Sequence, residues 1–144
     1  MGYALVPFLV VEDDDLDFRI LQRTFRKLHI ENPVIRATDG VEAMEMMKGM
    51  NGRKRLYPPY ITLLDINMPR KNGLEVLREM RADPDLKDNV VFVLSSSDAG
   101  SDVEEAYGQK VAGYVLKGLP SDDFAEAIRL IHRYPDLPSP SNDC

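Results

Sequence analysis

Five short, mostly apolar runs recur along the chain, and polar or charged residues follow most of them. The first run is continuously apolar instead of alternating, which is typical of a strand buried on both faces of a parallel sheet. Pro7 would interrupt the interior of such a strand, so it marks the start of the run. The pattern predicts strands at residues 8–11, 34–37, 61–64, 90–94 and 113–116.

The segments between these runs carry apolar residues at helical spacing. The first series predicts a helix from Leu16 to Leu28. Further helices are predicted at residues 41–50, 74–81 and 101–109, and from the capping residues 121–123 through 131. Strands and helices therefore alternate along the chain. This order favours an α/β fold, with a doubly wound, five-stranded parallel sheet, right-handed crossovers and helices on both faces.

The length and composition fit one ordinary globular domain. The chain has 144 residues, of which 44% are hydrophobic and 29% are charged. We expect a domain at residues 1–133 and an extended or disordered, proline-rich tail at residues 134–144. Such a tail is too short for an output domain that binds DNA or catalyses a reaction.

Charge, cysteine content and hydropathy narrow the class of protein further. The net charge of −6 disfavours nucleic acid as a partner, because nucleic-acid binders need a basic face. The single cysteine, Cys144, cannot form an internal disulfide, so the fold needs no oxidising compartment. The first residues lack the features of a signal peptide, and no stretch approaches the roughly 20 apolar residues of a membrane span. We therefore expect a cytoplasmic protein with no membrane partner.

Polar side chains end four of the five predicted strands. Glu12 and Asp13 follow the first strand, Asp65 the third, Ser95 the fourth and Lys117 the fifth. In doubly wound sheets, ligands and reacting groups gather beyond the carboxyl ends of the strands. One polar strand end means little, because every strand has to end somewhere. Four together form a chemically coherent set and indicate a site.

Three of these residues are carboxylates, and they suggest a metal site. Glu12, Asp13 and Asp65 would repel one another and raise each other's pKa unless a cation compensated them. A few oxygen ligands that leave room for water and a phosphate suit Mg²⁺. The sequence therefore indicates a magnesium site at this edge of the sheet.

A simpler interpretation of the acidic run is that it only begins the following helix. Asp14 or Asp15 would then be the cap, and Asp17 would lie in the first turn, where a negative charge favours the helix dipole. Capping does not explain why residues 12 and 13 would gather beside a carboxylate on another strand. We expect both roles to be present in this segment.

Asp65 is the candidate nucleophile. Carboxylates attack phosphorus to form aspartyl phosphates, and the transferred group carries charge that must be neutralised on several sides. Mg²⁺, the Lys117 ammonium and the Ser95 hydroxyl could each take one phosphoryl oxygen. Lys117 could also be an ordinary surface lysine, but a lysine directly after a buried strand and facing three carboxylates is better explained as a counter-charge.

These residues resemble the receiver domains of bacterial response regulators, from about residue 8 to residue 133. Glu12-Asp13 is similar to the acidic pair of the family, and the segment 63–69, together with Gly73, is similar to its phosphoacceptor segment. Ser95 stands 30 residues after Asp65, where the family has Thr or Ser. Lys117 stands a further 22 residues on, where the family has its lysine. The ordered set, with these spacings, is specific.

The resemblance implies a flavodoxin-like sheet with the strand order 2-1-3-4-5 and a set of ligands. Asp13, Asp65 and the backbone carbonyl of Asn67 would hold Mg²⁺, with Glu12 acting through water. A sensor histidine kinase or a phosphotransfer protein would supply the phosphoryl group. The chain would be a signalling protein and not an enzyme, apart from its own phosphorylation and dephosphorylation.

The resemblance also implies a switch. Phosphorylation would draw Ser95 inward and let Tyr114, at the aromatic switch position, follow. The change would remodel the face formed by the fourth helix, fifth strand and fifth helix, which could also form a homodimer. The segment 67–73 further resembles the stand-alone regulators that serve phytochrome-type kinases.

One position departs from the family. Its lysine is usually followed by proline, often after a cis peptide bond, whereas Gly118 follows Lys117 here. A cis bond without proline costs several kcal/mol, so we expect this bond to be trans or the segment to be flexible. The orientation of the Lys117 side chain then depends on the residues that surround it.

Three other functions compete with this interpretation. A phosphatase of the haloacid dehalogenase type would need a general acid two residues after Asp65, and Asn67 cannot act as one. A receiver-like module that only binds partners, without phosphorylation, would find support in Gly118. A flavodoxin would need a Ser/Thr/Gly-rich phosphate loop after the first strand, where this chain is acidic.

Overall fold

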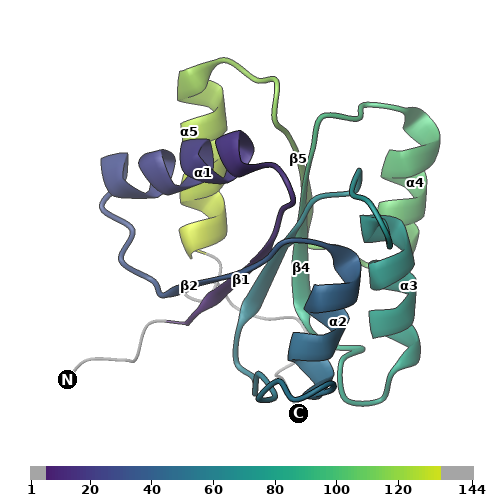
Figure 1. Ribbon diagram of the computed structural model, residues 1–144. Helices are drawn as coiled ribbons and strands as arrows, with labels where there is room; N and C mark the ends of the chain where they lie inside the picture. Colours follow the sequence, from purple (N-terminus) through teal and green to yellow (C-terminus); the bar gives the residue numbers. More distant parts are fainter. Residues whose placement is uncertain (1–5, 134–144) are drawn as a thin grey trace, which may run out of the picture.

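The computed structural model describes residues 6–133, in which strands and helices alternate (Figure 1). The strands are β1 (Phe8–Val11), β2 (Val34–Ala37), β3 (Ile61–Leu64), β4 (Val90–Ser95) and β5 (Gly113–Leu116). The helices are α1 (Asp15–Lys27), α2 (Gly40–Lys48), α3 (Gly73–Ala82), α4 (Gly100–Gly108) and α5 (Ser121–Arg133). The predicted tail at 134–144, with Cys144, lies outside the described residues.

The strands form one parallel sheet in the order β2-β1-β3-β4-β5, which confirms the predicted fold. Val11 at the end of β1 is in register with Leu64 at the end of β3. Asp65, the residue directly after β3, still donates its backbone N–H to the Val11 carbonyl oxygen at 3.0 Å. Register alone therefore brings the residues that follow these two strands to the same place on the sheet edge.

Two apolar layers enclose the sheet. Helices α1 and α5 cover one face, and α2, α3 and α4 cover the other (Figure 1). Successive β1 residues alternate between the layers: Leu9 and Val11 pack on the side of α2 to α4, and Phe8 and Val10 on the side of α1 and α5. Each fully buried side chain of this kind contributes about 1.5–3 kcal/mol, so the strands that carry the site are anchored on both faces.

The helix boundaries differ from the predicted ones by one or two residues. Helix α2 was expected to run through Met50 but ends at Lys48, because Gly49 adopts a left-handed conformation (φ 71°) and caps it. Helix α3 begins at Gly73, one residue early, after a capping box formed by Asn72 and Glu75. Within residues 6–133, no helix is long and apolar enough to cross a membrane.

Candidate functional site

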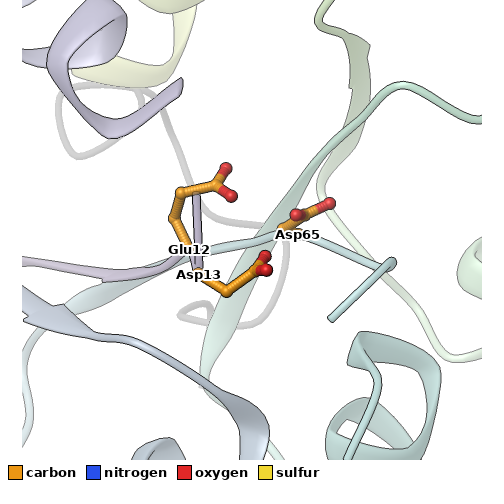
Figure 2. A group of neighbouring side chains, drawn as sticks. All are labelled: Glu12, Asp13 and Asp65. Carbon is orange, nitrogen blue, oxygen red and sulfur yellow. The ribbon is translucent and has the colours of Figure 1, made fainter. Parts of the chain in front are cut away.

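The carboxylates predicted to meet lie together beyond the carboxyl ends of β1 and β3. Figure 2 shows Glu12 and Asp13 following one strand and Asp65 following its neighbour, with their carboxylates gathered at the sheet edge. One oxygen from each lies within 4.8 Å of the others. Glu12 and Asp65 are buried, with exposed fractions of 4% and 5%, whereas Asp13 is exposed. The group thus has a buried side and a side open to solvent.

Lys117, just beyond β5, provides the opposing charge. Its Nζ lies 2.6 Å from Glu12 Oε1, 2.9 Å from Asp17 Oδ2 and 3.2 Å from Asp65 Oδ2. The backbone N–H of Lys117 donates to the Ser95 carbonyl oxygen, which continues the β4–β5 pairing past the strand ends. The ammonium group therefore points toward the cluster of carboxylates and not into solvent.

Burial and neighbouring charges shift the pKa values of this group. Burial raises the pKa of Glu12 to about 7, against the opposing hydrogen bond from Lys117. Burial also raises the pKa of Asp65, although the Lys117 charge partly offsets it. Burial alone would lower the pKa of Lys117, but its bonds to Glu12 and Asp17 and the charge of Asp65 raise it. One ammonium does not fully compensate these carboxylates, so the site favours a further cation.

The pKa of Glu12 predicts how stability depends on pH in metal-free protein. Unfolded Glu12 loses its proton near 4.5 but folded Glu12 near 7, so folded protein binds more protons between these values. The free energy of unfolding should therefore fall as pH rises through this window, by about 3 kcal/mol in all, since one pKa unit corresponds to about 1.4 kcal/mol. Chemical unfolding at several pH values between 4.5 and 7, in the presence of a chelator, measures this dependence of stability on pH. Glu12→Gln should flatten the slope; an unchanged slope in this variant would contradict the assignment.

The segment between β1 and α1 is held by a helix cap and by Arg36 of β2. The Asp14 side chain accepts a hydrogen bond from the Asp17 N–H at 2.9 Å, so Asp14 and not Asp15 is the cap. Asp15 instead pairs with Arg36 at 2.8 Å. Arg36 Nε also donates to the Glu12 carbonyl oxygen at 3.0 Å. These contacts fix the backbone that carries the acidic pair.

The segment between β3 and α3 leaves little room around Asp65. The Asn67 N–H lies 3.3 Å from Asp65 Oδ1, while the Asn67 side chain is exposed. The Gly73 N–H donates to the Ile66 carbonyl oxygen at 2.8 Å. A Cβ atom at Gly73 would overlap the Asp65 carbonyl oxygen and lie 2.8 Å from the Ile66 Cα. The start of α3 thus packs directly on the backbone of Asp65.

Ser95 and Tyr114 lie on a separate chain of contacts. Ser95 is fully buried at the end of β4, and its Oγ accepts a hydrogen bond from the Ser97 N–H at 3.0 Å. The Tyr114 hydroxyl donates to the Ser97 carbonyl oxygen at 2.8 Å, and the Ser97 hydroxyl donates to Asp102 of α4 at 2.6 Å. Within residues 6–133, no hydrogen bond joins Ser95 to Asp65. Ser97 therefore links the two predicted switch residues to α4.

The sequence did not predict the roles of two residues of the site, Asp17 and Ser97. Asp17 was assigned to the first turn of a helix, and its contact with Lys117 spans 100 positions in the sequence. Ser97 lies in a run of three serines, and nothing in their order distinguishes one from another. The Lys117–Gly118 bond is trans; among the described residues, the cis bond joins Pro58 to Pro59.

The comparisons with known proteins agree with this geometry. The family model of the response regulator receiver domain matches residues 8–129. Response regulator Rcp1 of Synechocystis sp. is 32% identical over 126 residues, which are 88% of this chain and 86% of Rcp1.

Two solved structures are also similar. The crystal structure of Mn²⁺-bound Rcp1 has a TM-score of 0.81 and 30% identity, and the alignment covers 94% of this chain and 99% of that one. The structure of the phosphorylated cyanobacterial phytochrome response regulator RcpA has a TM-score of 0.83 and 30% identity, with 96% and 100% covered. This chain therefore belongs to the response regulator receiver domains, the signalling proteins of two-component systems.

Proposed function

We propose that this response regulator accepts a phosphoryl group on Asp65 and signals by contact with other proteins. The observation that carries the proposal is the placement of Asp65, a buried carboxylate with Lys117 on Oδ2 and the Asn67 N–H near Oδ1. Both oxygens are thus oriented by fixed donors. A carboxylate held in this way is pre-positioned for one attack direction, which is the main contribution a protein makes to phosphoryl transfer.

The transfer we propose forms one bond and breaks one. An Asp65 carboxylate oxygen bonds to phosphorus as the bond from phosphorus to the donor nitrogen breaks, and the donor imidazole leaves with its electron pair. Negative charge on the phosphoryl oxygens then lies beside Lys117, whose ammonium is already within 3.2 Å of Asp65 Oδ2. Lys117 therefore stabilises the charge without a large rearrangement.

The acidic group fits a divalent cation, and we propose Mg²⁺. Carboxylate oxygens are the ligands that Mg²⁺ prefers, and one oxygen from each of Glu12, Asp13 and Asp65 lies within 4.8 Å of the others. Asp13, Asp65 and the Asn67 carbonyl would hold the ion, with Glu12 acting through water. When bound, Mg²⁺ supplies positive charge that offsets the phosphoryl oxygens. The Mn²⁺-bound structure of Rcp1 shows a relative with a divalent metal.

Partners and output follow from the same proposal. We propose that a sensor histidine kinase or a phosphotransfer protein donates the phosphoryl group, and that the transfer takes place in the cytoplasm. The kinase would be of the phytochrome type, because the similar protein RcpA is a phytochrome response regulator. The receiver domain would span residues 1–133. The signal would pass through Ser95, Ser97 and Tyr114 to the face of α4, β5 and α5, where a homodimer could form.

The proposal excludes turnover of external phosphomonoesters. A phosphatase of the haloacid dehalogenase type needs an acid to protonate its leaving group, and Asn67, two residues after Asp65, has only an amide. We therefore propose that the chemistry of this chain is limited to its own phosphorylation and dephosphorylation. A receiver-like module without phosphorylation would keep the fold but lose the chemistry.

Acetyl phosphate tests the function without the partner kinase. We expect intact mass spectrometry to show one added phosphoryl group after incubation with acetyl phosphate and Mg²⁺. The adduct should survive acid, be lost in base and be absent in chelator, because an acyl phosphate forms only when the charge of the donor is compensated. Protein that stays unmodified and binds no Mg²⁺ would instead indicate the binding module without phosphorylation.

A further inference from the structure

Lys117 is shared among three carboxylates, and one of them plays no part in the site proposed above. An ammonium group has three N–H donors, and Glu12, Asp17 and Asp65 each place an oxygen within 3.2 Å of Nζ. In this arrangement every N–H faces a carboxylate already in place. A phosphoryl oxygen that needs Lys117 must therefore displace one of these partners.

Asp17 is the partner that is easiest to displace. Glu12 is held by the Asp14 N–H at 3.1 Å as well as by Lys117, and both Glu12 and Asp65 are buried. The Asp17 side chain is 37% exposed, and within residues 6–133 its carboxylate contacts only Lys117. Water can hydrate the carboxylate as soon as it leaves Nζ, so the cost of release is small compared with that for a buried carboxylate.

The space beside the contact allows this movement. A small cavity of about 40 Å³ lies between α1, α5 and the site, and Asp17 and Lys117 line it. The remaining lining is mainly apolar, from residues Ile20, Leu21, Leu94 and Phe124, with Glu12. The cavity leaves the contact loosely packed, and the freed carboxylate turns outward to solvent and not into this apolar space. Asp17 lies in the first turn of α1, and its backbone N–H donates to the side chain of the cap residue Asp14. This hydrogen bond holds the turn in place whatever the orientation of the Asp17 side chain. The carboxylate can therefore turn away from Lys117 while the helix stays in place.

We propose that Asp17 is a positioning residue that competes with the incoming phosphoryl group for Lys117 and thereby slows phosphorylation. This inference rests on the proposed phosphorylation of Asp65. Asp17 also adds a negative charge close to the place where the donor's charge arrives, because both oxygens lie within 3.2 Å of one nitrogen. Removing the Asp17 charge leaves Lys117 held by Glu12 and Asp65, and the third N–H of the ammonium group is then available to a phosphoryl oxygen.

Asp17→Asn is expected to speed phosphorylation by about three- to tenfold, because one unit charge is removed near a partly solvated site. The measurement is the rate of adduct formation against donor concentration, with acetyl phosphate and with phosphoramidate. Release of Lys117 should raise the limiting rate with both donors. If Asp17 only repelled the donor, its removal should change only the donor concentration at half-saturation. That change should be seen mainly with acetyl phosphate, which is the more highly charged donor. Asp17→Glu, which keeps the charge, should stay near the wild-type rate.

Asp122→Asn is the matched control, since it removes the same charge from the first turn of α5, where the Asp122 side chain is 98% exposed and pairs at 4.0 Å with Lys27 and not with Lys117. A second measurement is the thermal shift produced by beryllofluoride with Mg²⁺, which should be larger in Asp17→Asn because the phosphoryl mimic gains Lys117. An equal or slower rate in Asp17→Asn, or equal acceleration in Asp122→Asn, overturns the inference while the proposed function stands. Wild-type protein that is never labelled overturns both.

Discussion

Asp65→Asn is expected to abolish labelling by acetyl phosphate and, at the same time, to make the metal-free protein more stable. Labelling is lost because an amide is not a nucleophile toward phosphorus. Stability rises because Asp65 is a buried carboxylate near Glu12 and Asp13, and burial raises its pKa. The gain should be on the order of 1 kcal/mol, the usual size of the effect of a single substitution. Lys117 keeps Glu12 and Asp17, so no buried charge is left unpaired.

Intact mass and denaturant unfolding of the same preparations measure both effects. Asp88→Asn is the control, because it removes one exposed carboxylate just before β4, at the opposite edge of the sheet. That variant should label at the wild-type rate and change little in stability. Full labelling of Asp65→Asn would place the phosphoryl group on another residue. A clear loss of stability would show that the carboxylate contributes more through Lys117 than it costs through repulsion.

Gly73→Ala should damage both the fold and the chemistry. A methyl group there overlaps the carbonyl oxygen of Asp65 and approaches the Ile66 Cα to 2.8 Å, and both atoms belong to the backbone. Overpacking of this kind costs about 1–3 kcal/mol, which exceeds the roughly 0.5–1 kcal/mol that alanine gains over glycine in a helix. The displaced Asp65 should react about tenfold to a hundredfold more slowly, because small misplacements of reacting groups are costly.

Gly100→Ala provides the matched comparison. Gly100 is also the first residue of a helix, but a Cβ atom there meets nothing within 4 Å. This variant should be as stable as the wild type or slightly more stable, and its labelling should be unchanged. If Gly73→Ala behaved like Gly100→Ala in both unfolding and labelling, the close packing of α3 against Asp65 would not matter for the site.

The strands and the sheet edge could be predicted from the sequence because they depend on local pattern and simple topology. The apolar runs give the strands, and a parallel sheet brings all their carboxyl ends to one edge. Glu12, Asp13, Asp65 and Lys117 were therefore predicted to meet. The structure places one oxygen of each carboxylate within 4.8 Å of the others, and Lys117 Nζ lies within 3.2 Å of Glu12 and Asp65. No side-chain detail was needed for this step, only the alternation of strands and helices.

The remaining contacts depend on which way a helical turn faces, which local pattern does not determine. Asp17, in the first turn of α1, contacts Lys117, just beyond β5, across 100 residues of sequence. The capping pattern gave no sign of it, since an acidic residue in a first turn already has a sufficient local explanation. The early end of α2, by contrast, was available from Gly49, whose left-handed conformation is a common helix terminator.

Asp65, and no other carboxylate of the cluster, is expected to receive the phosphoryl group. Protein labelled with acetyl phosphate and Mg²⁺ can be reduced with borohydride, which converts an aspartyl phosphate into homoserine, and then digested and sequenced by mass spectrometry. We expect homoserine at position 65 alone, with Asp13 and Asp17 unchanged. Homoserine at position 13 or 17, with Asp65 intact, would contradict it.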